Sequence, residues 1–174
     1  MDIITESYFN QFKKQYGYQD KEESEAFELF SIYCIVSKHI KTDTISRSML
    51  DDLNIGKGGD WGIDGIIIIV NGKLITSQQE VDDLLSANGT LHVKMILLQA
   101  KTSQKFNVGD FGKFLDGIEY ILQDILGEST LPSCNEDLIE YRNLVKYIYS
   151  KSADFENGKN PYYETYYVTC GDYN

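Results

Sequence analysis

Two apolar stretches, each carrying polar residues of particular types at one end, constrain the fold of this chain most. The first, residues 62–70, has Asp64 near its start, and the second, residues 91–101, ends with Gln99 and Lys101. Both are rich in Ile, Val and Leu, which is typical of buried strands. Two adjacent strands can bring an Asp, a side-chain oxygen and a Lys to one point, where a divalent cation can lie beside a phosphodiester.

The remaining pattern predicts helices and further strands around this pair. Asn71-Gly72 predicts a tight hairpin after the first strand, and Ser77 with Glu80 predicts a capping box. Asp20 is the expected N-cap of a long early helix. Helices are predicted at residues 5–16, 21–40, 77–85, 108–126 and 136–150, and further strands at residues 73–76 and 162–169. The fold class is therefore expected to be α/β.

Composition limits the class of protein. With 42% apolar and 25% charged residues, the chain (1–174) is expected to fold as one globular domain with a buried core. No apolar run approaches the ~20 residues that span a bilayer, and the polar start does not resemble a signal peptide, so a cytoplasmic protein without membrane contact is expected. Three cysteines without a C-x-x-C pair give no disulfide or zinc framework. Only His39 and His92 are present, which argues against a His-based nuclease or a Ser-His-Asp triad.

The net charge of −11 argues against a free-standing nucleic-acid-binding protein, because neutralising phosphates supplies most of the affinity of such proteins. Four lysines are nonetheless expected to gather around the predicted site: Lys94, Lys101, Lys105 and Lys113. An acidic domain can still cut nucleic acid if another domain or protomer supplies the remaining affinity.

The residues at the ends of the two strands suit a magnesium-dependent phosphodiesterase. Mg²⁺ prefers oxygen ligands and is often held by one or two carboxylates together with water and substrate. Asp64 would supply the first carboxylate, and the side chain of Gln99 and the backbone carbonyl of Ala100 would supply neutral oxygens. Lys101 shares the strand face of Gln99, where its ammonium could orient the attacking water or stabilise the transition state.

A second carboxylate is expected from the helix at residues 21–40. Glu25 and Glu28 lie three residues apart on one face of that helix, so both remain candidates. Glu28 is favoured because it lies deeper in the helix, between Phe27 and Phe30. Asp60, in the Gly-rich loop, is expected to shape the loop rather than to hold the metal directly.

These motifs carry a resemblance to a nuclease superfamily. The sequence GGDWGIDG at residues 58–65, followed by LQAKTS at residues 98–103, resembles the PD-(D/E)xK nucleases in their D…QxK form. Mrr-type restriction endonucleases have a similar arrangement, and the closer match is the N-terminal domain of the abortive-infection phage-resistance (AIPR) family. The similarity spans most of residues 20–126. Gln99 stands where an acidic residue is commoner.

The resemblance implies a restriction-endonuclease-like fold, a mixed β-sheet flanked by helices. It maps Asp64, Gln99 and Lys101 onto the superfamily motif, and Phe27-Glu28 resembles the Phe-Glu of Mrr-like proteins. It further implies Mg²⁺ or Mn²⁺ as the cofactor and hydrolysis of nucleic acid in phage defence, with DNA favoured over RNA. Superfamily members often dimerise, so a homodimer is one expectation. The chain is also expected to be the N-terminal part of a longer protein with a further C-terminal domain.

Two other hypotheses follow from the same residues. In the first, the chain is a catalytically inactive nuclease fold that serves as a protein-interaction module, with Asp64 and Lys101 as a buried ion pair. A cluster of tyrosines would then face a protein partner, although alternate members could instead pack within a strand: Tyr162, Tyr163, Tyr166 and Tyr167. In the second, Lys57-Gly58-Gly59 binds a nucleotide. The second is poorly supported, because this loop lacks Walker spacing and precedes a strand where a phosphate loop would open a helix.

Overall fold

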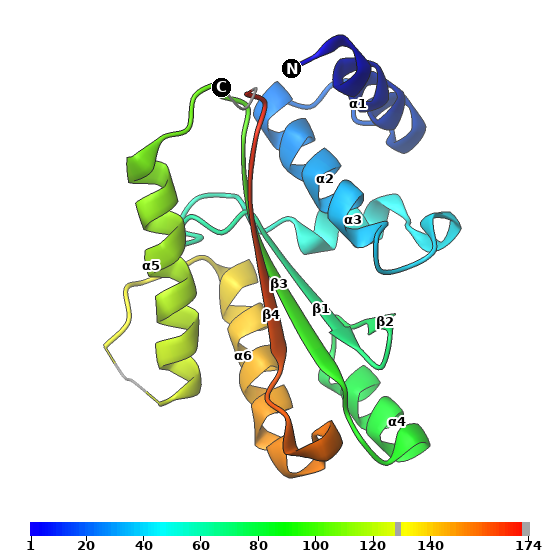
Figure 1. The fold of residues 1–174 in the computed structure, drawn as a ribbon, viewed down its shortest axis with the longest axis vertical. Coiled ribbons are helices and arrows are strands. Elements are labelled where there is room, and N and C mark those ends of the chain that lie inside the picture. Colours follow the sequence, from blue (N-terminus) through cyan, green and yellow to red (C-terminus); the bar gives the residue numbers. More distant parts are fainter. Residues whose placement is uncertain (128–129, 172–174) are drawn as a thin grey trace.

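The two long apolar stretches form the centre of a sheet. The computed structural model describes residues 1–127 and 130–171, and its sheet has the strand order β2-β1-β3-β4 (Figure 1). The strands are β1 (Gly65–Val70), β2 (Lys73–Leu74), β3 (Val93–Lys101) and β4 (Tyr162–Thr169). Strand β1 runs antiparallel to β2 and β3, whereas β4 runs parallel to β3.

Helices flank this sheet. In Figure 1, α5 and α6 lie on one side of the strands and α1, α2 and α3 lie on the other. The α-helices of the described residues are α1 (Ile3–Tyr16), α2 (Glu23–Val36), α3 (Arg47–Leu53), α4 (Gln78–Asn88), α5 (Val108–Ile125) and α6 (Glu136–Ser150), with short 3₁₀ helices at Thr42–Thr44, Ser152–Asp154 and Glu156–Gly158. The predicted α/β class, with a mixed sheet between helices, is confirmed. Within the described ranges, no helix combines the length and the apolar character that crossing a membrane requires.

Local sequence signals account for several element ends. The Ser77 hydroxyl accepts from the backbone N–H of Glu80, and the Glu80 carboxylate accepts from the N–H of Ser77, which is the predicted capping box at the start of α4. Asn71 and Gly72 adopt φ angles of 50° and 79° in the turn between β1 and β2. Positive φ at both central residues is the geometry that a tight hairpin requires. The hairpin prediction is therefore confirmed, although β2 is shorter than residues 73–76.

Several element starts differ from the prediction, and two of them bear on the candidate site. The helix expected at residues 21–40 is α2 (Glu23–Val36), and Glu22 rather than Asp20 occupies its N-cap position, without a side-chain hydrogen bond. The first strand begins at Gly65 instead of residue 62. Trp61 and Gly62 have φ angles of 57° and 76°, which a strand does not accommodate, so the chain turns immediately before Asp64.

The register assigns the functional residues to one face of the sheet. Gln99 on β3 lies directly opposite Tyr167 on β4, so the two side chains point to the same face. That face is covered by α5, because the ring of Phe114 lies 6.4 Å from the ring of Tyr167. Helix α2 covers the opposite face, where a Cβ on Gly65 would lie 3.0 Å from the side chain of Ile32.

Strand β1 is short at the end that positions the site. Its last pair with β3 is Gly65 opposite Leu98, and beyond that pair β3 continues to Lys101 with only β4 beside it. Residues 54 and 55 run antiparallel beside the start of β1, since Asn54 forms a bridge with Gly65 and the N–H of Ile55 donates to the Asp64 carbonyl at 3.0 Å. Residues 99–101 therefore form an edge of β3 that β1 does not cover.

Candidate active site

Three side-chain oxygen atoms converge on Gly56, close to the start of β1. A Cβ added to Gly56 would lie 3.0 Å from Asp64 Oδ1, 3.0 Å from Glu28 Oε2 and 3.3 Å from Asn54 Oδ1. These oxygens come from the start of β1, from α2 and from the C-cap of α3. We call this group, Glu28, Asn54 and Asp64 around Gly56, the oxygen cradle. The three oxygens therefore lie close to one another, and any side chain at position 56 would press against them.

Asp64 is buried and receives two stabilising contacts. Its Oδ2 accepts from the backbone N–H of Ala100 at 2.8 Å, and the ammonium of Lys101 lies 3.7 Å away. Burial nevertheless raises the pKa of Asp64 to about 6, against the lowering effects of the Ala100 N–H and of Lys101. The contacts from the Ala100 N–H and from Lys101 are thus too weak to offset the effect of burial on this carboxylate.

Glu28 shares the cradle with Asp64. Burial, followed by the charge of Asp64, raises the pKa of Glu28 to about 8, while Lys101 and a hydrogen bond from Asn54 act to lower it. A divalent cation between the two acids would favour both deprotonated forms, so the charge of Asp64 would no longer keep the proton on Glu28.

Gln99 contributes an unpaired oxygen. The residue is 2% exposed, and its Oε1 is buried with no hydrogen-bond partner among the described residues. Its Nε2 lies 3.2 Å from the position of a Cβ on Gly62. Since Gly65 lies opposite Leu98, Gln99 occupies the place opposite Asp64. A buried carbonyl oxygen without a partner is destabilised by about 1–3 kcal/mol, and it is also an oxygen ligand of the kind that Mg²⁺ accepts.

Ala100 and Lys101 complete the uncovered edge of β3. The N–H and C=O of one strand residue point in the same direction, so the carbonyl of Ala100 points toward the side of the strand from which Asp64 receives its N–H. Lys101 lies on the same face as Gln99, with 32% of its side chain exposed. Its ammonium can therefore reach both Asp64 and solvent.

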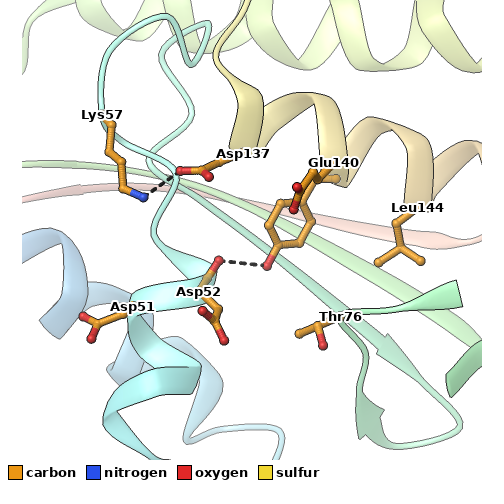
Figure 2. A pocket seen from close by; sticks show the side chains of 8 residues that line it. Asp51, Asp52, Lys57, Thr76, Asp137, Glu140 and Leu144 are labelled. Atoms are coloured by element: carbon orange, nitrogen blue, oxygen red, sulfur yellow. Dashed lines mark hydrogen bonds and ion pairs between the residues drawn. The ribbon is translucent and has the colours of Figure 1, made fainter. Parts of the chain in front are cut away.

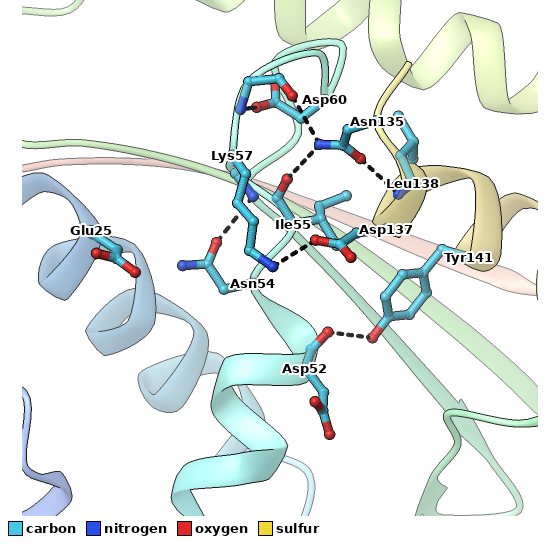
Figure 3. Close-up of polar contacts among 12 residues, drawn as sticks. Glu25, Asp52, Asn54, Ile55, Lys57, Asp60, Asn135, Asp137, Leu138 and Tyr141 are labelled. Atoms are coloured by element: carbon cyan, nitrogen blue, oxygen red, sulfur yellow. Dashed lines mark hydrogen bonds and ion pairs between the residues drawn. The ribbon is translucent and has the colours of Figure 1, made fainter.

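The loop before Asp64 is held by side chains. Asp60 accepts from the N–H groups of Gly58 at 3.0 Å and of Gly62 at 2.8 Å. Asn135, the N-cap of α6, donates to the carbonyls of Ile55 and Gly58, each at 3.0 Å (Figure 3). Asp60 thus has the loop-shaping contacts expected for it, and α6 anchors the segment that carries the cradle.

The structure separates residues that the sequence left together. Glu25, labelled on α2 in Figure 3, forms an ion pair with Lys21 just before that helix. Glu28 instead lies in the cradle. The expected gathering of lysines is wrong for Lys94, which pairs with Glu164 at 2.8 Å near the opposite end of β3. At about 3.3 Å per residue, it lies more than 20 Å along the strand from Lys101.

Two residues at the site were not predicted. Asn54 follows α3, a helix of seven residues that the sequence pattern does not reveal, and its Oδ1 also accepts from the N–H of Gly56 at 3.0 Å. Tyr167 packs in strand β4, which is one of the two expectations for the tyrosines. Its place opposite Gln99 was not predicted, and its hydroxyl is buried with no hydrogen-bond partner in the described part of the chain.

A second acidic hollow lies nearby and has different properties. Figure 2 shows this hollow of about 280 Å³, lined by Asp51, Asp52, Lys57, Thr76, Asp137, Glu140, Tyr141 and Leu144. Lys57 pairs with Asp137 at 2.7 Å, and the Tyr141 hydroxyl donates to the Asp52 carbonyl at 3.3 Å. None of its side chains has an unpaired buried polar atom within the described residues. Its excess of carboxylates would repel a phosphodiester.

The donor set of the oxygen cradle fits a hard divalent cation. No group of three His, Cys, Asp or Glu side chains suited to a metal occurs in the parts of the chain that are described. The cradle instead combines two carboxylates with an amide oxygen, which matches the preference of Mg²⁺ for one or two carboxylates completed by water and substrate.

Compared with known proteins, this chain matches no family model, no curated protein and no solved structure.

Proposed function

We propose that this chain is a metal-dependent nuclease domain that hydrolyses phosphodiester bonds of nucleic acid, with Mg²⁺ or Mn²⁺ as its cofactor. The observation that carries the proposal is the oxygen cradle, in which the carboxylates of Glu28 and Asp64 approach one point at 3.0 Å each. The unpaired Oε1 of Gln99 and the edge carbonyl of Ala100 would add neutral ligands beside it. Asp64, Gln99 and Lys101 then have the roles that the PD-(D/E)xK motif implies.

In this proposal the cation supplies Lewis-acid stabilisation of the charge that builds on the phosphoryl oxygens. The protein side chains would hold the cation, orient the attacking water and stabilise the charge of the transition state. Asp64 is fixed by the N–H of Ala100 and keeps its Oδ1 toward the cradle. The Lys101 ammonium, 3.7 Å from Asp64 and partly exposed, donates hydrogen bonds that orient the attacking water or stabilise the transition state.

The rival hypothesis, an inactive module with a structural ion pair, also has an observation in its favour, namely the proximity of Lys101 to Asp64. The electrostatics oppose it. Lys101 lowers the pKa of Asp64 as an ion pair would, but burial outweighs it and raises that pKa to about 6. The second carboxylate, Glu28, with its pKa raised to about 8, would serve no purpose in such a pair. A cation site accounts for all three residues.

The fold and biological role are proposed from the resemblance. A restriction-endonuclease-like core is compatible with the mixed sheet and its flanking helices. Similarity to the N-terminal domain of AIPR proteins suggests a role in phage defence, with DNA favoured over RNA as the substrate.

A cleavage assay tests the proposal. Labelled single- and double-stranded DNA and RNA are incubated with the native protein in Mg²⁺, Mn²⁺ or EDTA, beside Asp64→Ala and Lys101→Ala. We expect cutting that requires the metal and is lost in both variants, whereas Glu25→Ala, which removes a carboxylate from the same helix as Glu28, retains activity. Cutting in EDTA, or unchanged cutting by Asp64→Ala, would contradict the proposal.

A further inference from the structure

An exposed group of aromatic rings lies beside the candidate active site. Phe106, Phe111 and Tyr167 contact one another, with each pair of ring centroids 5.3 Å apart. Phe106 is 56% exposed, whereas the other two rings are partly covered. We call these three residues the aromatic platform. Packing of α5 onto the sheet needs Phe111 and Phe114, but it leaves more than half of the Phe106 surface in water.

Tyr167 connects this platform to the catalytic face. Its ring contacts Phe106, and its residue position lies opposite Gln99. Its hydroxyl is buried and has no hydrogen-bond partner within the described residues. Because Gln99 belongs to the candidate site and Tyr167 to the platform, the platform adjoins that site on one face of the sheet.

The segment that carries Phe106 is held in place. The backbone carbonyl of Gln104 lies 2.0 Å from the position of a Cβ on Gly171, so any larger residue there would displace the segment. The Ser103 hydroxyl donates to the Lys105 carbonyl at 3.0 Å, and Asn107 caps the first turn of α5. Phe106 is thus presented from a preorganised segment, which reduces the entropy lost when a ligand binds.

The charge of the protein decides what such a platform can bind. With a net charge of −11, the chain cannot obtain its affinity for nucleic acid mainly from phosphate neutralisation. Stacking of a base on an aromatic ring contributes affinity without net charge and tolerates any sequence. It requires a base whose face is free, as in a single strand, because the bases of a duplex stack on each other. Lys101 and Lys105 supply the local positive charge next to the platform.

We propose that the substrate is single-stranded nucleic acid and that one of its unpaired bases stacks on Phe106. The attached phosphodiester then runs past the partly exposed ammonium of Lys101 toward the oxygen cradle. This inference rests on the proposed nuclease function, because it defines the strand that the cradle would cut.

Fluorescence anisotropy of labelled oligonucleotides tests this inference without cleavage when it is measured on the native protein in EDTA. Single-stranded and duplex oligonucleotides of the same sequence are compared, with Phe106→Ala, Phe106→Trp and Tyr162→Ala. Tyr162 is the matched control, since it is an aromatic residue with 60% exposure at the far end of β4. We expect single strands to bind more tightly than duplex, Phe106→Ala to weaken that binding about tenfold, and Phe106→Trp and Tyr162→Ala to bind like the native protein.

Equal affinity of native protein and Phe106→Ala, or equal binding of duplex and single strand, would overturn the inference. Cleavage by the native protein in Mg²⁺ is scored separately. Metal-dependent cutting with no effect of Phe106→Ala on binding would overturn the platform and leave the nuclease function standing. Absence of binding to any oligonucleotide would overturn the platform as well, and Mn²⁺ binding by the cradle would then decide the proposed function.

Discussion

Glu28 and Asp64 approach the same point, the position of a Cβ on Gly56, at 3.0 Å each, although they come from a helix and from the start of a strand. Among the described residues, Lys101 is the one lysine or arginine in ion-pair contact with either carboxylate, 3.7 Å from Asp64. The charge of Asp64 opposes the ionisation of Glu28. The arrangement becomes favourable once a cation binds between the two carboxylates, so the residues that form it give specific predictions.

Replacing Gly56 tests the oxygen cradle. Gly56→Ala places a methyl group 3.0–3.3 Å from the three cradle oxygens, so these oxygens must shift and the carboxylates of Glu28 and Asp64 lose the spacing that holds one cation. We expect Mn²⁺ affinity to fall at least tenfold in a titration while the protein stays folded. Gly112→Ala is the matched control, because a Cβ there meets open space on α5. Unchanged Mn²⁺ affinity in Gly56→Ala would show that the cradle is not the binding site.

The raised pKa values predict how stability depends on pH. In the folded protein without metal, Glu28 keeps its proton to about pH 8 and Asp64 to about pH 6, against ordinary pKa values of 4.5 and 3.8. For each group, between its ordinary pKa and its raised pKa, the folded state binds more protons than the unfolded state. The free energy of unfolding therefore decreases as the pH rises from 5 to 8. Thermal unfolding in EDTA should show this decrease, and it should be smaller in Glu28→Gln.

The comparison with Glu28→Gln removes contributions from other groups. The lowered pKa of His39 acts in the opposite direction near neutral pH, and it is common to both proteins. Mn²⁺ binding at pH 7 should also release protons, which calorimetry in two buffers of different ionisation enthalpy measures. The same pH dependence in both proteins, with no proton release, would contradict the assignment of Glu28 to the site.

Restoring an acid at position 99 tests the ligand role of Gln99. Gln99→Glu adds a third carboxylate opposite Asp64, and a higher ligand charge strengthens the binding of hard divalent cations. We expect Mg²⁺ and Mn²⁺ to bind about tenfold more tightly, and the metal-free protein to unfold at a lower temperature because another buried charge is introduced. Weaker metal binding in this variant would place the Gln99 oxygen outside the ligand set.

Tyr167→Phe separates the role of the ring from that of the hydroxyl. The native hydroxyl makes no hydrogen bond within the described residues, so its removal should leave the unfolding temperature unchanged or slightly raised. Oligonucleotide affinity should stay close to that of the native protein, because the variant keeps the ring that contacts Phe106. Tyr163→Phe is the control, because it removes a hydroxyl that lies 3.0 Å from that of Tyr149 and should lower stability without affecting binding. A large loss of affinity in Tyr167→Phe alone would contradict binding through the ring faces of the platform.

The central strands and their polar ends were predictable because their signals are local. The apolar runs fix β1 and β3, and the Asn71-Gly72 turn and the Ser77–Glu80 box fix the elements between them. Strand alternation then places Gln99 and Lys101 on one face. These signals need no knowledge of the tertiary structure.

The missing parts of the site depend on tertiary contacts. Helix α3 is too short for a hydrophobic period to stand out, so Asn54 could not be placed. Tyr167 reaches the site only through the parallel register with β3, which pairs residues far apart in sequence. The choice between Glu25 and Glu28 depended on which turn of α2 reaches the end of β1, and the helical spacing alone left both on one face.

Calorimetric titration of Mn²⁺ into the native protein, Asp64→Asn and Asp137→Asn tests the central claim most directly. Asp137→Asn removes the same charge from the separate acidic hollow of Figure 2. We expect one Mn²⁺ to bind per chain in the native protein and in Asp137→Asn, and binding to be lost in Asp64→Asn. Equal Mn²⁺ binding by the native protein and Asp64→Asn, or binding that is lost only in Asp137→Asn, would contradict a metal centre at the oxygen cradle.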